Sequence, residues 1–370
     1  DHPVTLPKEM DRARSFIHLL YRQAALTMSY SDYALAQAAI DNAAHHIDAW
    51  EELYILKAAL NFKFHQLSAV KDSLQKITGL SDSIQVKTLK ADLALQEGRY
   101  GEAHSGYEGV IEKNRTWDNL ARLAHVKSKM GDGSGASTMY VEAQAQITAK
   151  DMRSFSWLEL QRGLLDFHSG RHEEALAHYE RANKAYSGYW LVEAHMAEAF
   201  GALRKFDKAV ALYEKLITRM AKPELQQALG DLYLFMGKPN QAKPWHEKAL
   251  TAYLTSAQRG EVHYLHHLAR YYADAQEEGP EAVKWARMDL QLRKNFSTHD
   301  AMAWALYRNR QFVEAINEMS AALSSGIRDA HLFFHAAMIY LAAGRVEESK
   351  QFLQQATDVN PHFTAFHAHH

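Results

Sequence analysis

Residues 163–182 read GLLDFHSGRHEEALAHYERA, and this stretch decides the fold. Tyr179 follows Ala175 by four residues, so both side chains lie on one face of a helix. Gly163 stands twelve residues before Ala175 and is also small. Gly170, which lies between them, is suited to end a first helix because glycine tolerates the left-handed conformation. The stretch therefore predicts two helices that approach closely through small residues.

The same pattern recurs along the chain. The column of Ala175 comprises Ala36, Ala69, Ala103, Ala136, Ala175, Ala209, Ala242, Ala282, Ala315 and the small Ser349. The successive gaps are 33, 34, 33, 39, 34, 33, 40, 33 and 34 residues. The column of Gly163 comprises Ala24, Ala91, Ala124, Gly163, Ala197, Gly230, Ala303 and Ala337. A period near 34 is typical of a stacked array of helix pairs.

This pattern resembles the tetratricopeptide repeat, a helix–turn–helix unit of about 34 residues. The resemblance implies an all-α fold, a right-handed α-solenoid of about ten units over residues 17–363. The units are expected to begin near Ile17, Trp50, Ile84, Trp117, Ser156, Trp190, Pro223, His263, Phe296 and Ala330.

The same register predicts how the chain is divided. Residues 1–16 form an N-terminal segment, and residues 364–370 form a His-rich tail. The two long gaps predict short insertions near 148–156 and 254–262, where the array could bend. Between these ends we expect one continuous solenoid, because each unit of a repeat array packs on its neighbours.

Composition excludes several classes of protein. The net charge is −2, whereas a nucleic-acid binder usually presents a basic face, so no nucleic-acid partner is expected. The sequence has no run of eighteen apolar residues, so no transmembrane helix is expected. The chain has no cysteine, which excludes disulfides and thiol chemistry.

The first residues bear on location. The chain begins Asp1-His2-Pro3 without an initiator methionine, which fits a mature protein after signal-peptide removal. A chain shortened before expression would begin in the same way. The first interpretation predicts an exported bacterial protein in the periplasm, and the alternative is the cytoplasm.

The sequence offers no catalytic motif, so we expect no enzyme and no cofactor. It has neither a Gly-x-Ser-x-Gly elbow nor a His-Glu-x-x-His metal helix. The glycine-rich residues 131–135 have no following Gly-Lys-Ser/Thr and fall at an expected turn between paired helices. We interpret them as that turn.

Histidine is unusually frequent, with 22 among 370 residues. His263 and His267 share a helical face through their i, i+4 spacing, and Glu261 stands nearby, so these three are the candidate metal ligands. The other interpretation is that such histidines fill ordinary interface positions. Two ligands one turn apart leave a zinc ion at least two ligands short.

The resemblance also implies a binding surface. In the family, the first helix of each unit lines a concave groove, and its second, fifth, ninth, twelfth and thirteenth residues point inward. The candidate groove residues in this register are His18, Tyr21, Trp157, Leu160, Leu164, Phe167, His168, Leu234, Phe235, Tyr264, His267, Tyr271, Trp304, Tyr307 and Phe334. None of the ten fifth positions is lysine, so the carboxylate clamp that holds chaperone tails is not expected.

These observations favour a non-catalytic scaffold that binds a peptide or partner protein in an aromatic-rich groove. Two alternatives stay open at this point. One is a structural protein that self-associates as a homo-oligomer in an envelope assembly. The other is a His-rich, metal-related accessory protein.

Overall fold

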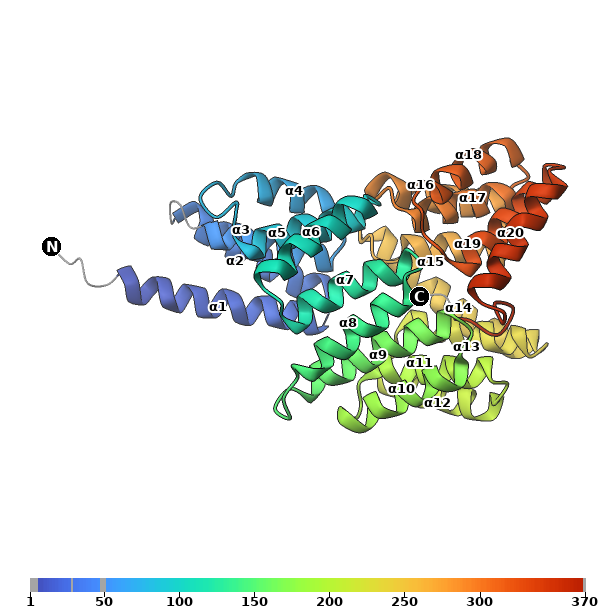
Figure 1. Cartoon of the computed structure of the whole chain (residues 1–370), viewed down its shortest axis with the longest axis horizontal. Coiled ribbons are helices and arrows are strands. Elements are labelled where there is room, and N and C mark those ends of the chain that lie inside the picture. Colours follow the sequence, from blue (N-terminus) through green and yellow to red (C-terminus); the bar gives the residue numbers. More distant parts are fainter. Residues whose placement is uncertain (1–5, 28, 47–50, 369–370) are drawn as a thin grey trace.

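The structure is a computed structural model, and it describes residues 6–27, 29–46 and 51–368. Over these ranges the chain forms twenty α-helices and no strand (Figure 1). The all-α prediction is therefore confirmed. Asp1, His2 and Pro3, on which the expectation of export rests, lie outside the described residues, as do His369 and His370.

The helices form ten antiparallel pairs. The first helices of the pairs are α1 (Leu6–Thr27), α3 (Glu51–Lys63), α5 (Ile84–Gln96), α7 (Trp117–Lys129), α9 (Met152–His168), α11 (Trp190–Ala202), α13 (Pro223–Phe235), α15 (Leu265–Asp274), α17 (Phe296–Arg308) and α19 (Ala330–Ala342). The second helices are α2 (Tyr30–His46), α4 (Leu67–Gln75), α6 (Tyr100–Lys113), α8 (Gly133–Ala145), α10 (His172–Ala185), α12 (Phe206–Arg219), α14 (Pro239–Gln258), α16 (Gly279–Leu292), α18 (Phe312–Leu323) and α20 (Val346–Val359). Six first helices begin at the residue where the register places a unit: α5, α7, α11, α13, α17 and α19.

The two columns of small residues hold the paired helices together. Ala175 and Ala209 are fully buried, and only Ala69, in the short α4, is partly exposed in its column. A Cβ atom added at Gly163 would lie 2.2 Å from Cε1 of Tyr179, and one at Gly230 would lie 2.2 Å from Cδ2 of His246. The small residue on one helix thus makes room for the ring on its partner.

A leucine in place of Ala209 should test this packing. Overpacking a filled core costs about 1–3 kcal/mol, because Ala209 has no exposed surface into which a larger side chain could turn. Ala211→Leu on the same helix α12 is the matched control, since Ala211 is exposed. Urea denaturation should show a lower midpoint for Ala209→Leu only, and equal midpoints would show that the register is wrong.

The two insertions lie at the ends of helices. The later one lengthens α14 to 20 residues, and the earlier one adds residues 146–151 between α8 and α9 together with a longer α9. Similarly, α1 begins at Leu6, well before Ile17, so most of the expected N-terminal segment belongs to the first helix. Bending at the two joints stays a prediction.

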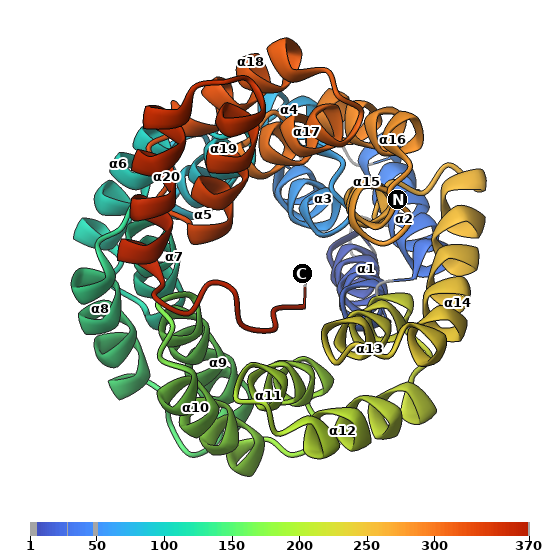
Figure 2. The ribbon, with the colours of Figure 1, turned by 90° about the vertical axis from the view of Figure 1, so that its right-hand side faces the viewer.

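The array winds into a ring whose successive turns touch (Figure 2). The amide of Val262 donates to the hydroxyl of Tyr30 at 3.1 Å, although the two residues stand 232 positions apart. The amide of Arg328 donates to the carbonyl of Lys129 at 2.9 Å. Each contact joins units about six repeats apart. The superhelix is therefore held by contacts between turns as well as between neighbouring units.

Gly98 lies at such a contact, where its φ is +77° and an added Cβ would lie 2.7 Å from the carbonyl oxygen of Lys294. Gly344 has the same φ, +78°, with open space around it. We expect Gly98→Ala to destabilise the chain by about 1–3 kcal/mol more than Gly344→Ala, because only the first adds a clash to the cost of a left-handed alanine. Urea midpoints of the two variants give the comparison, and equal losses would contradict the contact between turns.

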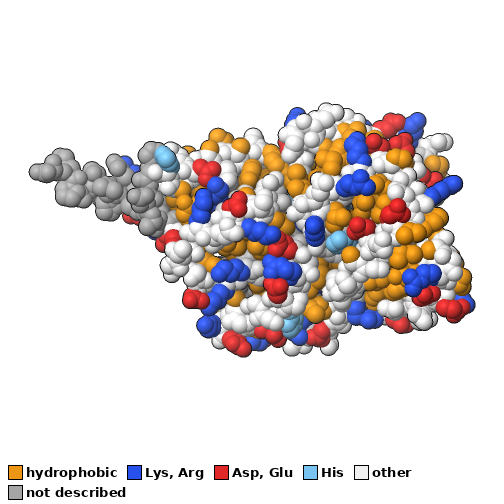
Figure 3. All heavy atoms as spheres, turned by 90° about the horizontal axis from the view of Figure 1, so that it is seen from above, with side chains coloured by type: hydrophobic (Ala, Val, Ile, Leu, Met, Phe, Trp, Pro, Cys, Tyr) orange, Lys and Arg blue, Asp and Glu red, His pale blue; other side chains and the backbone are white. Residues whose placement is uncertain are grey.

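The ring has two layers. Figure 2 shows the odd-numbered helices α9, α11, α13, α15, α17 and α19 on the inner side of the ring and their even-numbered partners outside. The space that the inner helices enclose, which we call the central channel, contains cavities of about 920 and 440 Å³. On the outer face seen in Figure 3, Lys and Arg are interspersed with Asp and Glu. No helix among those described is long and apolar enough to cross a bilayer.

Candidate functional site

The central channel holds residues 360–368, the last residues that the structure describes. After α20 ends at Val359, residues 360–368, which we call the tail, leave the helical array and run into the middle of the ring (Figure 2). Two turns shape its first part, with the amide of Phe363 donating to the carbonyl of Asn360 at 3.1 Å and that of Ala365 to His362 at 2.8 Å. The tail is thus a non-helical peptide seated on the inner helices.

Phe366 is the apolar anchor of the tail, with 3% of its surface exposed. Its ring occupies space that opens because residue 201 is glycine: a Cβ there would lie 2.4 Å from Cδ1 of Phe366. The ring of Phe235 lies 5.7 Å from it, centroid to centroid. Phe366 and Ala368 join the core of α11, α12 and α13. Burying a phenylalanine side chain contributes about 1.5–3 kcal/mol.

Glu198 is the polar anchor. This glutamate of α11 is fully buried, and its Oε1 lies 2.7 Å from Nδ1 of His367 and accepts the amide of Ala368 at 2.8 Å. Its Oε2 lies 2.9 Å from Nδ1 of His195. A buried carboxylate is stable only when donors surround it. The tail supplies one such donor, the amide of Ala368, and places the imidazole of His367 beside the same oxygen.

Two tyrosines stand on the outer side of Glu198. Burial first, and then the negative charge of Glu198, raise the pKa of Tyr179 and of Tyr213 well above the ordinary value. Both phenols therefore stay neutral. Because Tyr179 also fills the space over Gly163, the packing of the fifth unit and the environment of Glu198 share one residue.

The imidazole of His367 lies among rings. It stacks on His331 with centroids 4.8 Å apart and planes 19° from parallel, and Phe167 and His168 lie at 5.5 and 5.9 Å. A flat side chain with a ring nitrogen fits this place, since it stacks on His331 and sets that nitrogen against Glu198.

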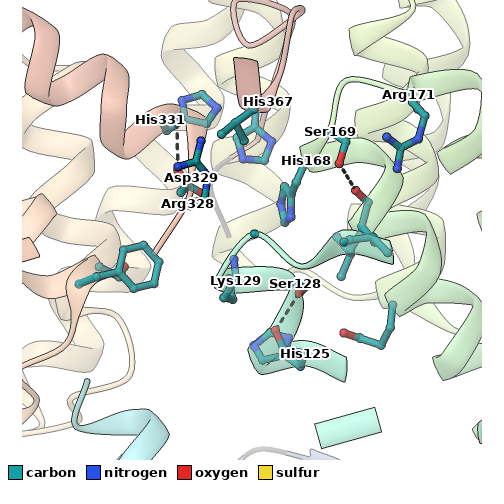
Figure 4. Close-up of a pocket in the computed structure, with 18 of the residues that line it drawn as sticks. His125, Ser128, Lys129, His168, Ser169, Arg171, Arg328, Asp329, His331 and His367 are labelled. Atoms are coloured by element: carbon teal, nitrogen blue, oxygen red, sulfur yellow. Dashed lines mark hydrogen bonds between the residues drawn. The ribbon is translucent and has the colours of Figure 1, made fainter. Parts of the chain in front are cut away.

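A cavity of about 920 Å³ continues from His367 toward α7 and α17. Figure 4 shows His168, His331 and His367 grouped at one edge of it, with Lys129 and Arg328 nearby. Burial alone would raise the pKa of Asp329, but Lys129, His331 and the amide of Leu332 together outweigh burial and lower the pKa of that carboxyl. The charged residues that line the cavity are Lys129, Arg171, Arg270, Arg328, Asp300, Asp329 and Asp358.

Two histidines of this cavity should make the protein sensitive to acid. Burial, followed by the charge of Lys129, lowers the pKa of His125 to about 4 and that of His168 to about 3, from 6.5. Between pH 6.5 and these values the unfolded chain binds more protons than the native one, so stability falls as the pH falls. Each histidine lowers the free energy of unfolding by at most about 1.4 kcal/mol for each pH unit. Urea denaturation at pH 7 and 5 should show a smaller loss for His125→Gln with His168→Gln than for wild type, and an equal loss would contradict this.

The predicted groove residues divide into three groups. Phe167, His168, Phe235 and Phe334 contact rings of the tail, and Leu164, Leu234, Tyr271 and Trp304 line cavities beside it. Four of the fifteen have little or no exposed surface: Leu160, Phe167, Tyr271 and Trp304. The others lie elsewhere: Trp157 against Trp117, Tyr264 and His267 against Tyr253, Tyr307 on Trp304, and His18 and Tyr21 on α1.

Sequence reasoning missed Glu198, Gly201 and the tail. Glu198 and Gly201 are the ninth and twelfth residues of the unit that begins at Trp190, and both positions point inward in the register. A carboxylate at an inward position between apolar neighbours was the available signal. Nothing in the sequence of the tail indicates that it folds back into the channel.

The three candidate metal ligands do not converge. His263 stacks on His65, His267 stacks on Tyr253, and Glu261 accepts from the hydroxyl of Ser256 at 2.6 Å. Within the described ranges no three His, Asp or Glu side chains are grouped to hold a metal ion. Many histidines instead pair with carboxylates between helices: His178 with Glu159, His246 with Asp231, His266 with Asp289, His299 with Glu318 and His335 with Asp300.

Comparisons with known proteins agree with this architecture. Residues 223–255 and 330–363 match the model of the tetratricopeptide repeat family. No curated protein matches the chain. Among solved structures, the human IFIT1 dimer with PPP-AAAA is 12% identical with a TM-score of 0.50, over 95% of this chain and 84% of that one.

Two further structures are similar in fold. The APC/C hetero-tetramer Cut9–Hcn1 is 14% identical with a TM-score of 0.49, over 96% of this chain and 71% of that one. A tetratricopeptide repeat protein from Parabacteroides merdae is 16% identical with a TM-score of 0.40, over 66% of this chain and 94% of that one. The two matched stretches are tetratricopeptide repeats, and the described helices repeat the same pairing along an α-solenoid. The fold of the chain is that of a protein–protein interaction scaffold, a class that is typically non-catalytic.

Proposed function

We propose that the central channel is a binding site for a non-helical segment of a partner protein, which the scaffold holds without catalysis. The observation that carries this proposal is the tail: a peptide of this kind already lies in the channel, with Phe366 buried and the amide of Ala368 bonded to Glu198. The tail shows how backbone and side-chain contacts combine there.

The exposed apolar surface of the inner layer supports the proposal. Leu234 and Phe235 end α13 beside the tail and remain 41% and 40% exposed. A large apolar patch next to convergent polar groups is typical of a binding site. The outer helices also expose apolar side chains, such as Val313 at 72% on α18 and Val346 at 45% on α20, and these provide a matched comparison.

A peptide library tests the proposal. Random dodecamers displayed on phage are selected on the tail-released chain, defined as Phe366→Ala with His367→Ala. We expect enriched peptides that bind one to one and lose at least about tenfold in affinity, or about 1.4 kcal/mol, when Leu234→Asp and Phe235→Asp are added. The control additions Val313→Asp and Val346→Asp on the outer helices should leave the affinity unchanged.

Two results would contradict the proposal. One is a selection that enriches no peptide, and the other is binding that survives the α13 changes but is lost with those on α18 and α20. Self-association is a separate outcome of the same experiment. A tail that enters the channel of another copy makes a head-to-tail contact, which gives rings or open chains whose size grows with concentration.

A further inference from the structure

The tail defines a specific subsite within the channel, and this inference rests on the function proposed above. We call it the inner subsite: Glu198, Gly201, Phe235 and His331. From its geometry we infer that it selects a partner segment with three consecutive features: an aromatic residue, a flat nitrogen-bearing side chain and a small residue. Phe366, His367 and Ala368 occupy it as an internal competitor that the partner must displace.

The first position must be aromatic because of the shape around residue 201. Gly201 has no Cβ, and this leaves room for the edge of a ring. A Cβ at this position would also lie 3.2 Å from Cδ1 of Leu232, so a side chain there would close the space. The ring of Phe235, itself 40% exposed, covers the other side. A slot bounded by apolar atoms takes a flat apolar ring and offers nothing to a charged side chain.

The second position must place a flat nitrogen-bearing group beside Glu198. Oε1 of this fully buried carboxyl lies 2.7 Å from Nδ1 of His367, so a segment without such a group gives up that polar contact. The neighbouring ring of His331 favours a planar partner. Histidine and arginine meet both demands, whereas aspartate or glutamate would place a second negative charge against the first.

The third position must be small. Ala368 has no exposed surface, and its amide donates to the same Oε1 at 2.8 Å. A larger side chain would have to enter the core formed by α11, α12 and α13. The subsite thus recognises two side chains and limits the size of a third. One backbone amide fixes the register of the segment.

The tail has an advantage as a competitor because it is attached to the scaffold. A tethered ligand acts at an effective concentration of about 1 mM when the link is short. A free peptide with identical contacts therefore binds wild type weakly, and a real partner either makes further contacts in the adjoining cavity or acts where the tail has been released.

The test uses the full chain and a fluorescent peptide with the sequence of residues 361–368, PHFTAFHA. We expect saturable binding to the tail-released chain at least about tenfold tighter than to wild type. Adding Glu198→Gln should weaken binding by about tenfold or more, because the acceptor of the Ala368 amide loses its charge and hydrogen bonds to charged groups are the stronger ones. Gly201→Leu should abolish it by filling the slot.

Changes in the peptide provide the same test with the protein untouched. Alanine in place of the phenylalanine that matches Phe366, or glutamate in place of the histidine that matches His367, should each reduce affinity at least about tenfold. Alanine in place of the threonine that matches the exposed Thr364 is the control and should have no effect.

Three results would overturn the inference. The first is equal binding of the peptide by wild type and the tail-released chain, and the second is equal binding of the altered and unaltered peptides. The third is the enrichment of library peptides that lack the three consecutive features, here called the triplet, and bind without Glu198. In the last case the channel would still be a peptide site, so the proposed function would stand while the triplet fell. Failure of every peptide would remove both.

Discussion

Gly163→Ala is expected to lower the free energy of unfolding by about 2–3 kcal/mol, although alanine is the better helix former. The added Cβ would lie 2.2 Å from Cε1 of Tyr179, and that ring is fully buried with no room to turn. One of the two paired helices must therefore move. Because an array of repeats can unfold in parts, the fifth unit should lose its amide protection first.

Gly109→Ala in α6 is the control, since its Cβ would meet nothing within 4 Å. That variant should gain about 0.5–1 kcal/mol from helix propensity. A second variant, Gly163→Ala with Tyr179→Leu, should recover part of the loss because the ring that clashes is gone. The prediction is wrong if Gly163→Ala and Gly109→Ala have the same urea midpoint.

Phe366→Ala is expected to release the tail and leave the ten units folded. Truncating a buried phenylalanine costs about 3–5 kcal/mol when a cavity must remain, but the tail can leave the channel instead of leaving a void. The amide of Ala368, which donates to Glu198, should then exchange with solvent about 10–100 times faster, corresponding to the roughly 1.5–3 kcal/mol of lost burial.

Hydrogen exchange followed residue by residue measures this effect. Thr364→Ala is the matched control in the same segment, because Thr364 is exposed and its loss should leave the tail seated. Amides of the inner helices away from the tail, such as those of α5 and α7, should keep their protection in both variants. Unchanged exchange at Ala368 in Phe366→Ala would show that the slot at Gly201 does not hold the tail.

The sequence was sufficient to predict the fold because the same pattern recurs in ten units, so a departure in one unit does not obscure the others. Ala175, Ala209 and most of their counterparts have no exposed surface, and the register placed six first helices at the residue where they begin. The contacts between turns could not be predicted, since a small rotation between units decides whether Val262 reaches Tyr30 six repeats away.

The site was predictable only in part, for a similar reason. The register indicates which side chains point inward, and it placed Phe167, Phe235 and Phe334 beside the tail. It does not indicate how deeply each is buried, so Tyr271 and Trp304 were assigned to the groove although they pack within the wall. The path of the tail depends on Glu198, and the repeat pattern does not single it out, because Asp92 and Asp231 stand at the same ninth position of their units.

The central claim is that the channel of this chain holds its own tail as a bound peptide. A photo-reactive benzoylphenylalanine placed at Phe366 measures this directly, because a benzophenone reacts only with groups in contact. We predict cross-links within one chain to α11 and α13, near Gly201 and Phe235, identified by mass spectrometry of the digested monomer. Cross-links to the outer helices, cross-links only between two chains, or no cross-link would contradict the account.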